Sequence, residues 1–176
     1  YVGAKPIFVD VDPNSLCIDP KKISKFINKK TKAVIAVDLF GNVALNDEIK
    51  KICRKNKIYL IEDAAESVGA KYKGKMAGSF GDVSLFSFNA TKLIMSGQGG
   101  CLCTNNKKIY EKAKLFSHHG IDKNLTGKYY WSSLLGYNYN WTNIQAACAI
   151  AQLDRIKELI NYKKNIYRTY KKYFLK

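Results

Sequence analysis

The sequence predicts an α/β fold, a three-layer sandwich built around a mostly parallel sheet. Apolar segments of strand length alternate with segments of helical periodicity. The order strand, helix, strand, helix, strand implies parallel strands joined by right-handed crossovers. The chain has 176 residues, of which 47% are hydrophobic, and this is enough to bury a substantial core. We therefore expect one domain, or a large part of one.

The first elements are predicted from apolar runs and capping residues. Pro6–Val11 is typical of a short strand that runs into a turn, and Asp19–Pro20 is typical of a helix N-cap followed by a first-turn proline. Ala33–Leu39 is nearly all apolar, as expected for a parallel strand covered on both faces. Asn46 can cap a second helix, and Ile58–Ile61 forms another buried strand.

The second half of the chain continues the alternation. Tyr72–Lys75 indicates a tight turn, and Val83–Phe88 and Cys101–Thr104 indicate two further strands. A helix is expected over Lys107–Phe116, and a last long helix begins near Thr142 and runs to the end of the chain. The sequence shows no internal repeat and no low-complexity linker.

The formal net charge of +16 raises the question of nucleic-acid binding. Lysine supplies nearly all of this charge and is spread through the helices and turns, and no nucleic-acid recognition motif accompanies it. We expect solvated lysine faces and no specific nucleic-acid partner. The segment Tyr162–Lys176 is a partial exception, because it interleaves Tyr, Lys and Arg and could contact an acidic partner.

The cysteines and the hydropathy bear on compartment and metals. The five cysteines are an odd number without CxxC spacing, which favours free, mostly buried thiols in a reducing compartment. Cys101 and Cys103 share one strand face, which fits core packing better than zinc ligation, and no metal site is predicted.

No apolar stretch approaches the length of a membrane span, and Tyr1 opens without a leader peptide. We expect a cytoplasmic protein that does not bind membranes.

Acidic residues follow one of the predicted buried strands. Glu62 and Asp63 come directly after Ile61, and small residues follow them. Ligands of open parallel sheets bind beyond the carboxyl ends of the strands, so an acid here can face a ligand. The alternative is that Asp63 caps the next turn.

The segment Phe86–Lys92 leads from a buried strand into polar residues that end in a lysine. A lysine desolvated beside an apolar strand end becomes a competent amine nucleophile for a carbonyl group. The hydroxyl of Ser87 could hold a phosphate. Most of the other lysines of the chain are expected to be solvated. Lys92 is a stronger candidate for a site residue than they are, because the sequence also offers Asp63 and the Ser87 hydroxyl.

Seven separated segments occur in the order seen in one enzyme family. They are Ile61–Glu66, Tyr72–Lys75, Gly78–Asp82, Phe86–Lys92, Gly99–Gly100, His119–Gly120 and Gly136–Asn140. From about Val2 to Ile160 the chain resembles the DegT/DnrJ/EryC1/StrS aminotransferases, which are fold-type-I pyridoxal-phosphate enzymes acting on nucleotide-linked keto sugars. Thr142–Ala147 looks most like the perosamine-synthase-like branch.

The resemblance implies roles for individual residues. Lys92 matches the lysine that forms the internal aldimine with pyridoxal 5'-phosphate and later shuttles a proton. Asp63 matches the carboxylate that bonds the pyridine nitrogen and keeps it protonated. Ser87 matches a ligand of the cofactor phosphate. Glu66 stands where relatives commonly have Gln or His near the cofactor ring.

The resemblance also implies a homodimer. Asn138 or Asn140 matches an asparagine that reaches the phosphate in the neighbouring subunit's site. Two positions depart from the family pattern, since Asp38 stands where many relatives have histidine and Asn140 where they often have arginine. These departures affect the expected substrate preference more than the reaction type.

The resemblance implies transamination of a nucleotide-linked 4-keto-6-deoxy sugar, with glutamate as donor and 2-oxoglutarate as by-product, for a surface polysaccharide or glycan. Residues 1–176 would be a partial aspartate-aminotransferase-like large domain that binds the cofactor. The amino-terminal segment and the carboxy-terminal small domain of the family are expected to be absent. The alternatives are a pyridoxal-phosphate sugar dehydratase of the same fold, or a catalytically incomplete fragment that acts only as a basic binding module. The sugar and the nucleotide stay open.

Overall fold

The computed structural model describes residues 2–122 and 131–174. The chain divides into two compact units. The first unit lies within residues 1–86 and 101–103, and the second lies within residues 87–100 and 104–176.

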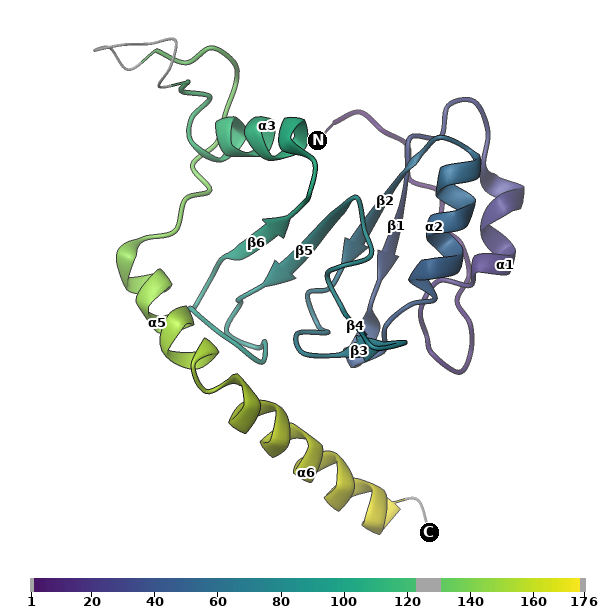
Figure 1. The fold of residues 1–176 in the computed structure, drawn as a ribbon, viewed down its shortest axis with the longest axis vertical. Coiled ribbons are helices and arrows are strands. Elements are labelled where there is room, and N and C mark those ends of the chain that lie inside the picture. Colours follow the sequence, from purple (N-terminus) through teal and green to yellow (C-terminus); the bar gives the residue numbers. More distant parts are fainter. Residues whose placement is uncertain (1, 123–130, 175–176) are drawn as a thin grey trace. The chain divides into compact units, whose positions relative to one another are not determined.

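A four-stranded sheet has the strand order β1-β2-β5-β6 (Figure 1). Its strands are β1 (Ala33–Val37), β2 (Tyr59–Asp63), β5 (Val83–Ser87) and β6 (Gly100–Cys103). β1 pairs in parallel with β2, and β2 pairs in parallel with β5. The arrow of β6 points opposite to that of β5 in Figure 1. The predicted α/β class with a mostly parallel sheet is therefore confirmed.

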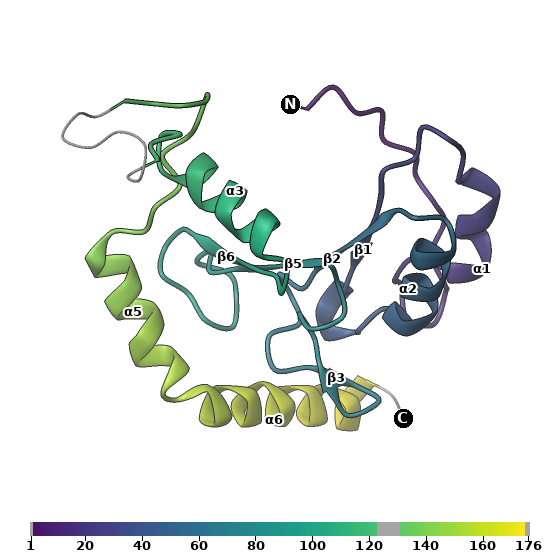
Figure 2. The same ribbon diagram turned by 45° about the horizontal axis from the view of Figure 1, so that its top comes forward.

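Two helical segments accompany β1 and β2. The helix α1 (Pro20–Ile23) continues as the 3-10 helix η1 (Ser24–Phe26), and α2 (Asn46–Lys55) lies beside it (Figures 1 and 2). The predicted cap of α1 is confirmed, since the Asp19 side chain accepts a hydrogen bond from the Lys21 amide. These elements bury one core, which is made of Cys17, Ile23, Val34, Ala36, Ala44, Ile49, Cys53 and Leu60.

The strand β1 is covered on one face only, contrary to the expectation of two covered faces. Val34 and Ala36 are buried, whereas Ile35 is 59% exposed. Successive side chains of a strand point to opposite faces, so the helices cover the face that carries Val34 and Ala36.

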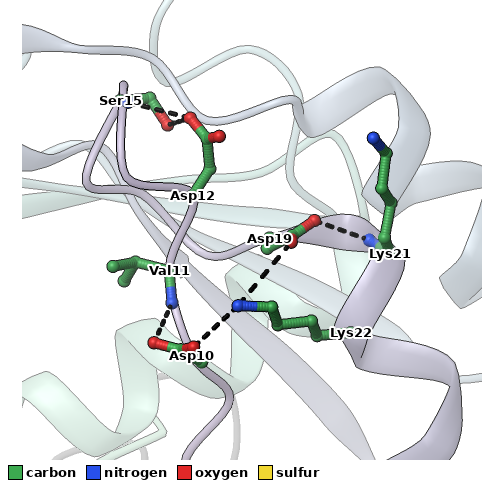
Figure 3. Close-up of polar contacts among 7 residues, drawn as sticks. All are labelled: Asp10, Val11, Asp12, Ser15, Asp19, Lys21 and Lys22. Carbon is green, nitrogen blue, oxygen red and sulfur yellow. Dashed lines mark hydrogen bonds and ion pairs between the residues drawn. The ribbon is translucent and has the colours of Figure 1, made fainter.

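The predicted strand at Pro6–Val11 is wrong. Only Val11 forms an isolated bridge, to Ile18, which closes the loop between them. Polar contacts replace strand pairing here, as Figure 3 shows: the Asp12 carboxylate accepts hydrogen bonds from the amide and hydroxyl of Ser15, and Lys22 Nζ lies 2.6 Å from Asp10 Oδ2. A strand needs a neighbour for its backbone groups, and the described residues supply one only at Val11.

The predicted cap at Asn46 is also wrong. Asn46 is the first residue of α2, and the N-cap position falls to Leu45 without a side-chain hydrogen bond. The Asn46 side chain is fully buried and donates to Asp38 Oδ1 over 3.2 Å. This bond to the buried Asp38 carboxylate fixes the orientation of the Asn46 side chain, and the Asn46 oxygen makes no cap hydrogen bond to the first turn of α2.

The predicted turn at Tyr72–Lys75 is confirmed as a β-hairpin. β3 (Lys71–Tyr72) and β4 (Lys75–Met76) pair in antiparallel fashion around a two-residue turn. Lys73 in that turn lies 2.7 Å from the Asp47 carboxylate, so the ion pair ties the hairpin to α2.

The second unit contains α3 (Lys107–Ser117), α5 (Asn143–Leu153) and α6 (Ile156–Phe174). Thr142 and Gln145 form a capping box at the start of α5. The helix start predicted near Thr142 is therefore confirmed. The single long helix that was predicted is instead two helices. Figure 2 shows that α6 leaves the direction of α5. The break at Asp154–Arg155 contains no glycine or proline, so no local breaker announces it.

The cysteines are less buried than predicted. Cys17 and Cys53 are buried, and burial raises the pKa of Cys53 to about 11. Cys101, Cys103 and Cys148 are exposed. The sulfur atoms of Cys101 and Cys103 lie 4.0 Å apart, in agreement with their predicted placement on one face of β6.

Candidate active site

Asp63 is the last residue of β2, and neighbouring backbones hold it in place. Its carbonyl oxygen accepts a hydrogen bond from the Asp38 amide at 2.9 Å, and the next amide, of Ala64, donates to Leu85 O. The half-buried Asp63 carboxylate accepts one hydrogen bond from Ala65 N at 3.1 Å. This bond is the turn contact that the capping interpretation predicted. It occupies Oδ1, and the structure gives Oδ2 no hydrogen-bond partner among the described residues.

Glu62 has a different role. Its carboxylate is fully buried and accepts hydrogen bonds from the amides of Gly78, Phe80 and Gly81 and from the Ser84 hydroxyl, at 2.6 to 2.9 Å. A carboxylate satisfied by four donors serves structure rather than ligand binding. Glu62 therefore anchors the loop at residues 78–81 against the sheet.

Ser87 is the last residue of β5, next to the loop that carries Lys92. Its hydroxyl oxygen accepts a hydrogen bond from Asn89 N at 3.3 Å. A serine hydroxyl can donate its own hydrogen at the same time, and a phosphate oxygen is a suitable acceptor.

Lys92 lies half-buried in a compact loop of the second unit. Its amide donates to Asn89 O at 2.9 Å, while Phe88 N donates to Gly99 O and Ser96 N donates to Phe88 O. Ile94 is fully buried and anchors the loop. The backbone around Lys92 is therefore closed on itself by hydrogen bonds.

A side chain of α5 fixes the same loop from outside. Gln152 Oε1 accepts from Met95 N at 3.1 Å, and Gln152 Nε2 donates to Met95 O. One amide side chain thus satisfies both backbone groups of a residue three positions after Lys92. Sequence reasoning missed this contact, since no local signal shows which helix residue will face a loop more than fifty positions away.

The glycine-rich segment Ser96–Gly100 is a close-packed turn that leads into β6. A Cβ atom on Gly99 would lie 1.9 Å from Trp141 Nε1, and Gly99 has a φ of +115°. The Trp141 ring also meets the Phe88 ring edge-on, at a centroid distance of 4.9 Å. Glycine is required here because the backbone touches an indole ring.

The two candidate asparagines differ in their contacts. Asn140 Nδ2 lies 2.7 Å from His118 Nδ1, at the C-cap of α3. Asn138 pairs with His118 through the backbone as an isolated bridge, and its side chain is exposed. His118 occupies the C-cap position of α3. Both asparagines are exposed, and Asn140 is the one whose side chain pairs with His118.

Glu66 lies beside a turn of the first unit. Its Oε2 accepts a hydrogen bond from Phe40 N at 3.0 Å. Phe40 belongs to the 3-10 turn η2 (Leu39–Gly41), which follows β1. The contact of Glu66 with this turn had no signal in the sequence.

Asp38 precedes that turn and is fully buried. It accepts hydrogen bonds from Ala44 N, Asn46 Nδ2 and Ser67 Oγ. Burial, and secondarily the nearby Glu62 carboxylate, raise the pKa of Asp38 to about 6. The residue that stands in the family's histidine position is therefore a structural carboxyl group under Leu39–Gly41.

The predicted site residues fall into two groups. Asp63 and Glu66 belong to the first unit, whereas Ser87, Lys92, Asn138 and Asn140 belong to the second. Within residues 2–122 and 131–174, no group of three or more His, Cys, Asp or Glu side chains is arranged to hold a metal ion. No helix in these ranges is long and apolar enough to cross a membrane.

Comparison with known proteins shows the family. The model of the DegT/DnrJ/EryC1/StrS aminotransferase family matches residues 1–176. The chain therefore belongs to this family, whose aminotransferases use pyridoxal phosphate.

Individual relatives agree in sequence and in fold. The chain is 42% identical to the GDP-perosamine synthase of Caulobacter vibrioides over 158 residues. This match covers 90% of the chain and 42% of the relative. It is similar, with a TM-score of 0.91 and 31% identity, to Helicobacter pylori PseC, an aminotransferase in pseudaminic acid biosynthesis, over 97% of the chain and 45% of that protein. It is also similar to the Escherichia coli GDP-4-keto-6-deoxy-D-mannose-3-dehydratase with bound hydrated pyridoxal phosphate, with a TM-score of 0.83 and 31% identity, over 94% of the chain and 46% of that protein.

The chain spans less than half the length of each of these three proteins. The likeness to solved sugar aminotransferases confirms the predicted fold type.

The side chains fit the cofactor of the family. Pyridoxal phosphate offers an aldehyde, a ring nitrogen and a phosphate, which call for an amine, a carboxylate and hydroxyl or amide donors. Among the predicted site residues, Lys92 carries an amine, and the Asp63 carboxylate has one oxygen without a hydrogen-bond partner among the described residues. Ser87 carries a hydroxyl, whose oxygen accepts a hydrogen bond from the Asn89 amide.

Proposed function

We propose that the protein containing this chain is a cytoplasmic aminotransferase. It transfers the amino group of glutamate to the keto carbon of a nucleotide-linked 4-keto-6-deoxy sugar and releases 2-oxoglutarate. The observation that supports this most is the co-occurrence of Asp63 at the end of β2 and Lys92 just after β5, at the family's motif positions, in a chain that matches the family throughout. The amino sugar would enter a surface polysaccharide or glycan.

In this proposal residues 1–176 belong to the large, cofactor-binding domain. Pyridoxal phosphate, when bound, supplies the electron sink for the carbanion formed at the amino-bearing carbon. Lys92 holds the cofactor aldehyde through its amine and then moves the proton at the reacting carbon. Asp63 stabilises the protonated pyridine nitrogen by a charge-assisted hydrogen bond.

The phosphate is held by Ser87 and by an asparagine of a second copy of the chain. The pairing of the Asn140 amide with His118 supports the assignment of Asn138, which meets His118 through its backbone bridge. Tyr137 and Tyr139 flank Asn138, and their stacked rings are 45% and 70% exposed, which supports a covered surface in a homodimer. Glu66 stays a predicted neighbour of the cofactor ring.

A dehydratase of the same fold is the second candidate, since one of the similar structures is a dehydratase. Such relatives typically replace the lysine that Lys92 matches, so Lys92 favours transamination. A basic binding module is the third, and the net charge of +16 supports it. Such a module would bind an acidic polymer in a salt-sensitive way and would not bind pyridoxal phosphate.

The test is reconstitution of the native protein with pyridoxal phosphate. We expect a visible absorbance band. Borohydride should then attach the cofactor permanently to Lys92, which is seen as a mass increase of the peptide that contains Lys92. We also expect amino transfer from glutamate to a 4-keto-6-deoxy sugar nucleotide. Lys92→Ala should abolish both, whereas Lys75→Ala, at an exposed hairpin lysine, should leave both intact. A Lys92→Ala protein that still transaminates would rule out the assignment.

A further inference from the structure

The turn after β1 holds an aromatic residue in an unfavourable state. Phe40 has φ +55° and ψ 26°, in the left-handed region, and it is 75% exposed. A bulky residue at positive φ is strained, and an exposed ring gains nothing from burial in the core. The fold of the first unit therefore does not explain why a phenylalanine occupies this position, and strain of this kind clusters at ligand sites.

Several contacts hold the turn in this conformation. Glu66 Oε2 accepts from the Phe40 amide at 3.0 Å. Asn42 N closes the turn onto Leu39 O at 2.9 Å. Asp38, immediately before the turn, is anchored by its three hydrogen bonds. The ring is thus presented to solvent on a rigid support.

The turn lies beside the end of β2. The Asp38 amide donates to Asp63 O at 2.9 Å, and Glu66 follows Asp63 by three residues. Asp38 and Glu66, which fix the turn, thus lie just after the adjacent parallel strands β1 and β2. Open α/β sheets bind ligands at this carboxyl edge.

We propose that the Phe40 ring is a contact surface for the hexose ring of the substrate, and that Glu66 is the positioning residue that holds it. This inference rests on the proposed function. If Asp63 bonds the ring nitrogen of the cofactor, the reacting carbon of the sugar lies across the pyridine ring from it, so the hexose comes nearer to this edge than the nucleotide does. The apolar C–H face of a hexose is a suitable partner for an aromatic face.

The charge of Glu66 is not needed for this role. The Phe40 amide needs an acceptor, and a glutamine side-chain oxygen at position 66 can supply it. Alanine cannot. Glutamine and alanine at position 66 therefore separate positioning of the turn from an electrostatic effect of the carboxylate.

The experiment measures the two half-reactions of the native enzyme separately. Phe40→Ala should slow amino transfer to the keto sugar nucleotide at least tenfold at subsaturating sugar, while the reaction with glutamate stays within threefold of wild type. The control is Tyr59→Ala, which removes an aromatic residue that is 56% exposed at the opposite end of β2, and it should change neither. If Phe40→Ala does not fold, Phe40→Leu should show the same selective loss.

Amide hydrogen exchange tests the positioning role of Glu66. Glu66→Ala should speed exchange at the Phe40 amide and slow the sugar half-reaction at least tenfold, whereas Glu66→Gln should preserve the protection and most of the rate. A folded Phe40→Ala enzyme with a sugar half-reaction within threefold of wild type would overturn the inference. So would a ring buried against another part of the polypeptide, which would appear as lost stability without a selective sugar defect. A wild-type protein without a glutamate half-reaction would refute the proposed function instead.

Discussion

Glu62 and Asp63 are neighbours in β2, and their carboxylates serve opposite faces of the sheet. Glu62 is fully buried and accepts four hydrogen bonds, whereas Asp63 is half-buried and accepts one. The strand pleat separates them, because successive side chains point to opposite faces. One acid therefore holds the fold, and the other is available at the strand end.

Glu62→Ala should lower the free energy of unfolding by about 3 kcal/mol, because it leaves buried amide donors without an acceptor. The measurement is urea unfolding of the native protein at neutral pH. Glu111→Ala is the control, since Glu111 is an exposed residue whose distance to Lys107 is 3.8 Å, and it should change stability by no more than about 0.5 kcal/mol. An equal effect of the two substitutions would mean that the four hydrogen bonds contribute little.

Asp63→Ala should cost several powers of ten in transamination rate, each power corresponding to about 1.4 kcal/mol of barrier. The reason is the loss of the negative charge that keeps the pyridine nitrogen protonated. Asp63→Asn should fall nearly as far, since an amide keeps the shape but not the charge. Steady-state kinetics of the reconstituted enzyme check this, and a rate within threefold of wild type would show that the charge is dispensable.

Asp38 should make stability fall as pH rises. Burial raises its pKa from the ordinary 3.8 to about 6, so between these values the unfolded chain loses the proton first. Stability is therefore lost progressively from about pH 4 to pH 6, by an amount on the order of 3 kcal/mol. Asp38→Asn removes this dependence and keeps an acceptor for Ala44 N.

Thermal unfolding of both proteins from pH 4 to pH 8 measures the effect. The advantage of Asp38→Asn over the wild type should grow through this window and then level off. A difference that stays constant with pH would mean that Asp38 does not titrate there in the folded protein.

Gln152→Ala should loosen the loop around Lys92. It removes the acceptor for Met95 N and the donor to Met95 O, with an expected loss of about 1–2 kcal/mol. Hydrogen exchange in a peptide spanning residues 93–97 should speed up. Gln152→Glu keeps the acceptor only, so intermediate protection is expected, and unchanged exchange in both variants would contradict the contact.

Local signals predicted most elements of the fold. The apolar runs at Ala33–Leu39 and Val83–Phe88 became β1 and β5, and Asp19 caps its helix. The failures depend on distant partners. Pro6–Val11 has a strand-like composition but only one bridged residue. Asn46 does not cap its helix, and its side chain donates instead to Asp38, eight positions earlier.

The candidate site was predicted to a similar extent. The positions of Asp63, Ser87 and Lys92 near strand ends follow from where apolar runs stop. The contacts of Glu66 with Phe40 and of Gln152 with Met95 were not foreseen, since they join residues 26 and 57 positions apart. Nothing in the local pattern distinguishes such a residue from its solvated neighbours.

The sequence by itself determined the order of strands and helices, the parallel sheet and the residues that follow each strand, because apolar periodicity and capping act over a few positions. The tertiary structure decided which of two adjacent acids is buried, which asparagine is paired with His118, and how Phe40 is held. Those outcomes depend on hydrogen-bond partners that come together only when distant segments pack, because a buried polar group is stable only where a donor or acceptor meets it.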